Sequence, residues 1–287
     1  MNQSTDTKNI YGLIGYPLSH SFSQKYFREK FKNENIIDSD YLNFPLQDIS
    51  EINELITNNP GIKGFNVTIP YKEQIIQYLT NIDKVAEKIG AVNTVKCHTI
   101  DGKKILTGYN TDIYGFELSL KPLLTGKEKN ALILGYGGAA KTVHFVLKQL
   151  GVDIKIASRN KKAEASIITK STTSMKIMDD KSGNKQTTKL FPDENIFINY
   201  NQISKQLLGK TDLIINTTPL GMWPKIDEYP DIPYEAIKNG SIAFDLIYNP
   251  ETTLFLKKCK EYGATVKNGY EMLVLQAEKA WEIFNIE

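Results

Sequence analysis

Residues 131–157, ALILGYGGAAKTVHFVLKQLGVDIKIA, decide the fold class of this 287-residue chain. The stretch opens with a short apolar run typical of a strand, Ala131 to Leu134, and closes with a second predicted strand, Val152 to Ala157. Between them lie a turn of small residues and a segment with helical periodicity that ends at Leu150. Because this succession has the length of one β-α-β unit of a mononucleotide fold, we predict a Rossmann-type domain.

The turn before the predicted helix has the composition of a dinucleotide-binding loop. Gly135, Gly137 and Ala140 occupy its three small-residue positions, and Gly138 and Ala139 leave the path of the backbone open. Backbone N–H groups in such a turn can approach a pyrophosphate, whose negative charge is favoured at a helix N-terminus. A tight strand-to-helix turn that binds no ligand is the alternative interpretation.

The residues after the second predicted strand distinguish NAD from NADP. An NAD site places an acidic residue there, which binds the ribose 2′-hydroxyl. This chain continues instead with Ser158-Arg159-Asn160-Lys161-Lys162, and a guanidinium suits a phosphate where a carboxylate would repel it. The alternative, that these cations only solvate the start of a helix, is disfavoured because cations oppose the dipole there. We therefore predict NADP as the cofactor.

The rest of the chain alternates short apolar runs with helix-like segments, which is typical of an α/β protein with mostly parallel sheets. The length suits two domains. We expect a hairpin around Asp101-Gly102 and a polar surface excursion from Ser166 to Pro192. Further strands are predicted at residues 10–15, 41–44, 62–67, 196–199, 213–216 and 242–246, and helical segments at 22–31, 71–79, 82–89, 113–124 and 269–286.

Composition and charge exclude several classes of protein. A net charge of +2, from 35 basic and 33 acidic residues, argues against nucleic acid or a membrane surface as the partner. No apolar run is long enough to span a bilayer, and Met1 to Asn9 lack the apolar core of a signal peptide. Cys97 and Cys259 share no metal or redox spacing, and the three histidines lie far apart. We expect a cytoplasmic protein without a metal that acts on a small molecule.

Polar clusters follow the predicted strands of the first half, each with a structural alternative. Ser19 and Ser21 could donate to a carboxylate, although Ser21 alone is typical of a helix N-cap. Lys72 would lie in the first turn of a predicted helix, where the dipole disfavours its charge; an ordinary surface lysine is the alternative. Thr111 and Asp112 precede a helix, where a simple cap is the default interpretation.

Eight motifs occur in a fixed order along the chain. They are Ser19-His20-Ser21, NVTIPYK at 66–72, GAVNT at 90–94, GYNTD at 108–112, GYGGA at 135–139, NTTPLGM at 216–222, DLIYNP at 245–250 and GYEMLVLQ at 269–276. As a series they resemble the shikimate dehydrogenase family, from Tyr11 to the end of the chain. Their joint occurrence is far more specific than any one motif.

The resemblance implies the reduction of 3-dehydroshikimate to shikimate with NADPH, in the pathway to chorismate and the aromatic amino acids. It implies an α/β substrate domain at residues 1–111, joined by the C-terminal helix at 270–287. A Rossmann-type NADP-binding domain would occupy residues 112–269, with the substrate in the cleft between the two domains. Where the family commonly has Asn-Arg-Thr, this chain has Ser158-Arg159-Asn160, which keeps the positive charge.

The resemblance also implies roles for individual residues. Lys72 and Asp112 would be the catalytic pair, and Ser19 and Ser21 would hold the substrate carboxylate. The substrate-binding residues would be Ser19, Ser21, Thr68, Lys72, Asn93, Asp112, Tyr248 and Gln276. The cofactor-binding residues would be Gly135, Gly137, Gly138, Ala139, Ser158, Arg159, Asn160, Leu246 and Gly269.

The catalytic pair makes chemical sense. A carbonyl that becomes an alkoxide needs a nearby donor, which the ammonium of Lys72 can be, and Asp112 can orient that lysine. Two alternatives remain: a quinate/shikimate dehydrogenase with relaxed substrate or cofactor use, and a non-catalytic nucleotide or metabolite sensor. We expect a monomer or a homodimer.

Overall fold

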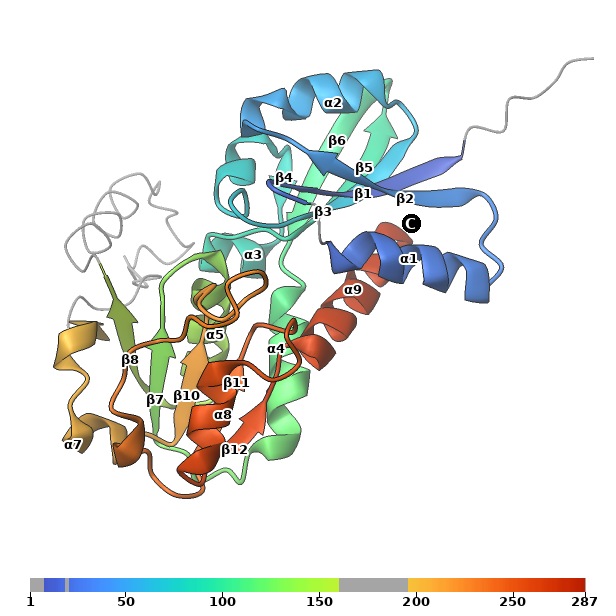
Figure 1. The fold of residues 1–287 in the computed structure, drawn as a ribbon. Helices are drawn as coiled ribbons and strands as arrows, with labels where there is room; N and C mark the ends of the chain where they lie inside the picture. The colour runs from blue at the N-terminus through green and yellow to red at the C-terminus, as the bar shows by residue number, and fades with distance from the viewer. Residues whose placement is uncertain (1–7, 19–20, 160–195, 287) are drawn as a thin grey trace, which may run out of the picture. The chain divides into compact units, whose positions relative to one another are not determined.

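A computed structural model of the chain forms two compact units (Figure 1). The first lies within Met1–Gly115 and Val274–Glu287, and the second within Phe116–Leu273. The structure describes residues 8–18, 21–159 and 196–286. Ser19, Asn160 and the predicted excursion from Ser166 to Pro192 therefore lie outside the described residues.

The first unit is built on a mixed six-stranded sheet in the order β2-β1-β3-β5-β6-β4. β1 pairs in parallel with β2 and β3, whereas β5 runs antiparallel to β3 and β6. Because β1 and β3 are parallel, the residues that follow them leave the same edge of the sheet. The strands are β1 (Asn9–Gly15), β2 (Ser39–Pro45), β3 (Ile62–Val67), β4 (Asn81–Ile82), β5 (Thr94–Ile100) and β6 (Lys103–Tyr109).

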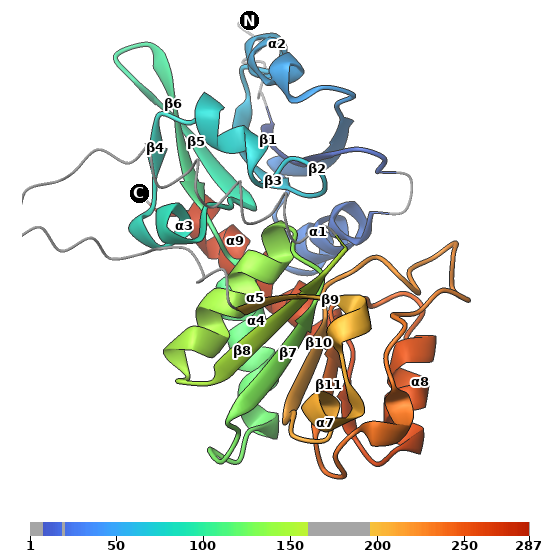
Figure 2. The same cartoon turned by 90° about the vertical axis from the view of Figure 1, so that its left-hand side faces the viewer.

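Helices cover both faces of this sheet, because apolar side chains alternate between the faces along its strands (Figures 1 and 2). α1 (Phe22–Asn33) and α9 (Tyr270–Phe284) pack on one face, against Tyr11 and Leu13 of β1. The next residue of that strand, Ile14, belongs to the core on the other face. That face is covered by α2 (Ile52–Asn58), a 3-10 helix (Gln74–Tyr78) and α3 (Lys84–Ile89).

The second unit has a six-stranded sheet whose neighbouring strands all pair in parallel, in the order β12-β11-β10-β7-β8-β9. Numbered along this unit, the order is that of the dinucleotide-binding Rossmann fold, in which ligands bind at the carboxyl ends of the strands. The strands are β7 (Asn130–Leu134), β8 (Asp153–Ser158), β9 (Phe197–Asn199), β10 (Leu213–Asn216), β11 (Ile242–Asp245) and β12 (Thr265–Lys267).

Helices lie on both faces of the parallel sheet (Figure 2). One face carries α5 (Gly138–Gln149) and α4 (Asp112–Leu120), whose Phe116 packs edge to face on Phe244 of β11. The other carries α7 (Lys205–Leu208) and α8 (Leu254–Glu261), which share a buried core with β7 and β10. The predicted α/β class and Rossmann-type domain are confirmed.

Two local predictions in the first unit had different outcomes. The hairpin between β5 and β6 forms, and Asp101 and Gly102 both take positive φ, 48° and 74°, as a tight two-residue turn requires. The α-helix predicted to include Lys72 is wrong. Lys72 precedes the five-residue 3-10 helix Gln74–Tyr78. It therefore does not lie in the first turn of an α-helix, where the helix dipole would act on its side chain.

Candidate functional site

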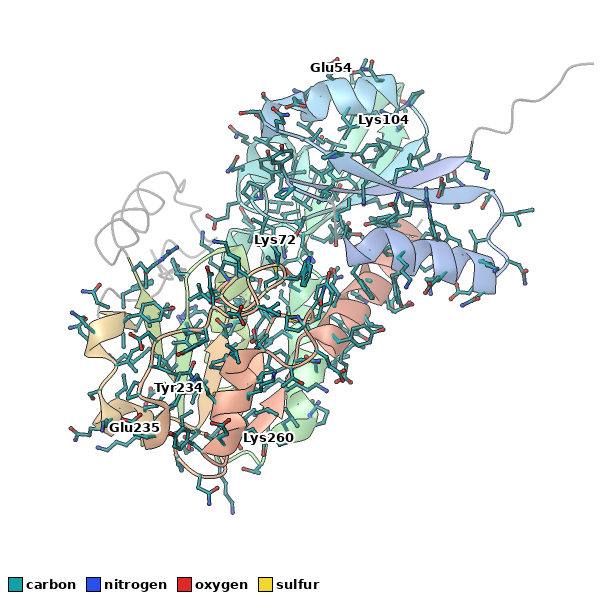
Figure 3. All side chains as sticks on the ribbon, viewed as in Figure 1. Glu54, Lys72, Lys104, Tyr234, Glu235 and Lys260 are labelled. Carbon is teal, nitrogen blue, oxygen red and sulfur yellow. The ribbon has the colours of Figure 1, made fainter. Side chains whose placement is uncertain are left out.

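A lysine and a carboxylate from distant parts of the first unit form an ion pair. Lys72 Nζ lies 2.6 Å from Asp112 Oδ2, and only 17% and 7% of the two side chains are exposed. Lys72, labelled in Figure 3, follows β3, and Asp112 is the first residue of α4. A largely buried ion pair needs further hydrogen bonds to offset the lost hydration, so its neighbours matter.

Backbone and capping contacts fix the two partners. The carbonyl of Lys72 accepts a hydrogen bond from Val92 N at 2.7 Å. At the start of α4, Asn110 Oδ1 accepts from Ile113 N at 3.3 Å, so Asn110 supplies a side-chain acceptor for that helix end. Thr111 does hold the N-cap position, since its carbonyl accepts a hydrogen bond from Gly115 N at 3.1 Å, but its hydroxyl bonds the side chain of Asn93.

Asn93 links Asp112 to a second helix. Asn93 Nδ2 donates to Asp112 Oδ1 at 2.9 Å and to Gln276 Oε1 of α9 at 3.3 Å. Asn93 Oδ1 accepts from Thr111 N at 2.7 Å. The predicted ligands Lys72, Asn93, Asp112 and Gln276 thus come from separate segments and meet in one hydrogen-bonded cluster, in which all but the half-buried Lys72 are buried.

Ser21 has the position of a helix cap without the interaction. It is the N-cap residue of α1, yet its side chain makes no capping hydrogen bond. Its Oγ is buried and has no hydrogen-bond partner among the described residues. Because an unpaired buried hydroxyl is costly, this favours a ligand contact over the alternative of a simple cap. Ser19, the other predicted carboxylate ligand, is not among those residues.

Thr68 lies where β1 and β3 end together. Its N–H donates to Ile14 O at 2.8 Å, which ties the two strand ends to each other. A Cβ at Gly15 would lie 2.4 Å from Thr68 Cγ2, so this close approach requires a glycine. Thr68 therefore lies beside the end of β1, from which the chain continues toward Ser21.

The glycine-rich turn follows β7 in the second unit. Gly135 has a φ of 96°, and a Cβ on it would lie 2.9 Å from Thr217 Oγ1. Gly137 is the N-cap of α5, where no side chain caps the helix and a Cβ would meet no described atom within 4 Å. Gly138 and Ala139 begin the helix. Uncapped N–H groups beside open space at a helix start fit the pyrophosphate of NADP.

The basic residue predicted to select NADP lies at the same edge of this sheet. Ser158 ends β8 and is buried, and the exposed Arg159 follows it. β8 pairs in parallel with β7 in the register Leu134↔Ala157, so Arg159 and the glycine-rich turn leave neighbouring strands in the same direction. Asn160 is not described.

Leu246 and Gly269, both predicted to lie beside the nicotinamide, are in contact. A Cβ on Gly269 would lie 2.1 Å from Leu246 O, and Gly269 N donates to Ile247 O at 3.0 Å. The half-buried Tyr248 lies in the same segment after β11. The structure brings these three predicted residues to one loop region of the second unit.

Sequence reasoning gave no role to Asp245, a buried acid at the end of β11. Its Oδ1 accepts from Asn216 Nδ2 at 3.0 Å and from Ile247 N at 3.1 Å, and its Oδ2 accepts from Thr253 Oγ1 at 2.6 Å. Burial raises the pKa of Asp245 to about 7. Asp245 thereby joins the ends of two strands and the start of α8. In the sequence, Asn216 and Asp245 each follow an apolar run and open one of the eight motifs, NTTPLGM and DLIYNP.

Within residues 8–18, 21–159 and 196–286, no group of three or more His, Cys, Asp or Glu side chains could hold a metal ion. No helix in that part of the chain is long and apolar enough to cross a membrane.

Known proteins resemble this chain along almost its whole length. Residues 13–95 match the family model described as the shikimate dehydrogenase substrate binding domain. A shikimate dehydrogenase (NADP(+)) of Methanosphaera stadtmanae is 39% identical over 279 residues, which are 96% of this chain and 90% of that protein. The chain belongs to the shikimate dehydrogenase family. The resemblance read from the eight motifs is therefore confirmed.

Solved structures of shikimate dehydrogenases share the fold. One in complex with NADP+ is 35% identical, with a TM-score of 0.77, and the match covers 97% of this chain and 90% of that one. The shikimate dehydrogenase of Aquifex aeolicus is 31% identical, with a TM-score of 0.78 over 99% of this chain and 94% of its own. These likenesses extend over both units.

Proposed function

We propose that this protein reduces 3-dehydroshikimate to shikimate with NADPH, reversibly, in the pathway to chorismate. The observation that carries the proposal is the buried ion pair of Lys72 and Asp112, with the hydrogen-bonding side chain of Asn93 beside it. NADP is supported by the relatives, which are shikimate dehydrogenases (NADP(+)), and by Arg159 after β8, where the described residues include no acid at the strand end.

Lys72 and Asp112 together transfer the proton that the reaction requires. Bound NADPH supplies the hydride. As the substrate carbonyl becomes an alkoxide, the ammonium of Lys72 hydrogen-bonds that oxygen and transfers a proton to it, so that ketone, hydride and proton give a secondary alcohol. Asp112 keeps Lys72 in place through the 2.6 Å contact and is available to a substrate hydroxyl. In the reverse direction Lys72 accepts the proton of the alcohol.

The substrate-binding residues supply polar partners for a polyhydroxylated acid. Each buried hydroxyl or carboxylate of such a ligand needs a hydrogen-bond partner, since an unpaired one is costly. The hydroxyls of Ser19 and Ser21 bind the carboxylate, a role supported by Ser21 Oγ, which has no hydrogen-bond partner within the described part of the chain. The remaining polar groups of the substrate are bound by Thr68, Lys72, Asn93, Asp112, Tyr248 and Gln276.

The two parts of the chain bind different ligands. Residues 1–111 with 270–287 form the substrate domain, and residues 112–269 bind NADP. The dinucleotide is held by Gly135, Gly137, Gly138 and Ala139 at the pyrophosphate, by Ser158, Arg159 and Asn160 at the 2′-phosphate, and by Leu246 and Gly269 beside the nicotinamide. Uncapped N–H groups at the start of α5 support the first of these contacts. We expect a cytoplasmic monomer or homodimer.

Initial rates with shikimate and quinate, each with NADP and NAD, test the proposal. We expect the highest kcat/KM for shikimate with NADP. Comparable values for quinate would indicate the relaxed quinate/shikimate enzyme, and no rate with any pairing would indicate a sensor. No observation on the described residues favours either alternative, and a sensor would have no need of the Lys72–Asp112 pair.

A further inference from the structure

A buried chain of polar side chains connects β2 to the candidate site through residues of β3 and β5 that are not themselves assigned as ligands. Its first member, Tyr41 on β2, is fully buried, and its ring stacks on Phe27 of α1 at 4.4 Å between centroids and 9° between planes. Asn66 on β3 and Thr94 on β5 continue the chain and are buried as well. Because each buried donor and acceptor needs a partner, the direction of every hydrogen bond in this chain can be worked out.

The hydroxyl of Tyr41 fixes the orientation of Asn66. Tyr41 OH donates to Asn66 Oδ1 at 2.8 Å, and Ser23 of α1 hydrogen-bonds the same hydroxyl. Burial raises the pKa of Tyr41 well above its ordinary value, so the hydroxyl keeps the proton that it donates. Asn66 must therefore present its Nδ2 to the other side, where it donates to Thr94 Oγ1 at 3.0 Å and to Asn93 O at 3.3 Å.

The same reasoning fixes the orientation of Asn93. Because Thr94 Oγ1 accepts from Asn66, its single proton is available to Asn93 Oδ1 at 3.2 Å or to Thr111 Oγ1 at 3.1 Å. Asn93 Oδ1 also accepts from the backbone N–H of Thr111, a donor that cannot reverse. Asn93 Nδ2 consequently faces Asp112 Oδ1, the oxygen that does not contact Lys72.

All hydrogen bonds on this path can thus point in one direction, from the phenol of Tyr41 toward the carboxylate of Asp112. We propose that Tyr41 is a remote positioning residue: through Asn66 and Thr94 it reinforces the orientation that the N–H of Thr111 gives to Asn93, and so holds Asn93 and Asp112 in place for substrate binding. The inference rests on the proposed function, because the orientation matters only if Asn93 and Asp112 bind the substrate. Chains of aligned hydrogen bonds polarise one another, which strengthens the last donor of the chain toward the carboxylate.

Tyr41→Phe tests the inference, because it removes the hydroxyl and keeps the ring that stacks on Phe27. Without its donor, Asn66 Oδ1 is unsatisfied and the amide is free to turn, which breaks the alignment at Thr94. We expect the KM for shikimate to rise and kcat to fall, for a combined loss in kcat/KM on the order of tenfold. The KM for NADP should stay at its wild-type value.

Tyr234→Phe is the matched control. Tyr234, labelled in Figure 3, is a buried tyrosine of the second unit whose hydroxyl donates to Pro230 O at 2.7 Å. Its loss should lower the melting temperature, as the loss of any buried hydroxyl contact does, and leave both kinetic constants for shikimate unchanged. A KM for shikimate that moves equally in both variants would reduce Tyr41 to a structural role and overturn the inference.

Thr94→Val supplies the second measurement, because it cuts the same path one step closer to Asn93. In this background Tyr41→Phe should add little to the KM for shikimate, since the alignment is already lost. Multiplying effects, or a Tyr41→Phe enzyme with wild-type constants, would overturn the inference. If Tyr41→Phe does not fold, Thr94→Val alone must raise the KM for shikimate and spare that for NADP. A wild-type protein without shikimate activity would instead contradict the proposed function.

Discussion

Val92 and Asn93, which are consecutive, hold the two partners of the ion pair. The N–H of Val92 donates to the carbonyl of Lys72 at 2.7 Å, and the side chain of Asn93 donates to the carboxylate of Asp112 at 2.9 Å. Lys72 and Asp112 lie 40 positions apart, yet one short segment before β5 determines where both are placed. Groups fixed in this way need little reorganisation during the reaction, which is where much of the catalytic effect of polar sites comes from.

Ser21→Ala separates a helix cap from a substrate ligand. The hydroxyl makes no capping bond and has no partner among the described residues, so its removal should leave the melting temperature unchanged. The KM for shikimate should rise about tenfold, since one hydrogen bond to a carboxylate is lost. Thermal unfolding and initial rates measure the two effects. A lower melting temperature together with a normal KM would instead support the interpretation of Ser21 as a simple helix cap.

Gly137→Ala should affect the cofactor and not the fold. Its φ of −109° suits alanine, and the added Cβ would meet no described atom within 4 Å, so stability should change by less than about 1 kcal/mol. The methyl group would occupy the space in which we place the pyrophosphate, so the Kd for NADP should rise at least tenfold. The effect is measured by titration with NADPH, whose reduced nicotinamide fluoresces, and an unchanged Kd would argue against this turn as the phosphate site.

Gly269→Ala should affect both the fold and the cofactor. The added Cβ would lie 2.1 Å from Leu246 O, so the backbone must move, at a cost of about 1–3 kcal/mol. Chemical denaturation should show a lower free energy of unfolding, and the KM for NADP should rise because Leu246 is displaced. If the variant were as stable as the wild type, the contact between the two segments would be looser than the structure indicates.

Asp245→Asn should change how stability depends on pH. Since burial raises the pKa of Asp245 to about 7, the folded state binds a proton that the unfolded state releases near pH 4, so this residue's contribution is lost as pH rises from about 4 to 7. The amide can still accept from Asn216 and Ile247 and can donate to Thr253. We therefore compare the free energy of unfolding of the variant with that of the wild type at each pH. The difference should favour the variant more at pH 8 than at pH 5.

The comparison with the wild type is essential because His144 acts in the opposite sense. Burial lowers the pKa of His144 to about 4, so its contribution to stability is lost as pH falls from 6.5 to about 4. Denaturant unfolding of both proteins across this range isolates the contribution of Asp245. An Asp245→Asn difference that does not vary with pH would show that the carboxyl group is ionised throughout.

The strong periodic signals of the sequence were sufficient for the Rossmann-type unit. β10 has the bounds predicted for it, residues 213–216, and α5 and β8 are displaced by no more than a few residues. β12 and α8 were not predicted: β12 has three residues, and the four residues before α8 include two threonines that give no clear apolar period. In the segment after Pro70 the helical pattern of apolar residues was real, but the backbone formed a short 3-10 helix instead.

The residues of the candidate site could be predicted from the sequence, but the hydrogen bonds between them could not. The motifs identified Lys72, Asn93 and Asp112, because each stands in a series that resembles one family. That Asn110 supplies the side-chain acceptor at the start of α4 and leaves Thr111 to bond Asn93 follows from the way β5, β6 and α4 meet, which no local pattern records. Hydrogen bonds between residues far apart in the chain depend on tertiary packing, so they are visible only in the structure.

Lys72→Ala, compared with Lys104→Ala, tests the central claim most directly. Lys104 belongs to the same unit and bonds the carbonyls of Pro60 and Ile62, away from Lys72 (Figure 3). The measurement is kcat for shikimate oxidation together with the Kd for NADP. Without Lys72, kcat should fall by at least about 10²-fold while the Kd stays the same, and Lys104→Ala should leave both unchanged. Near-normal turnover by Lys72→Ala would contradict the assignment of the proton transfer to the Lys72–Asp112 pair.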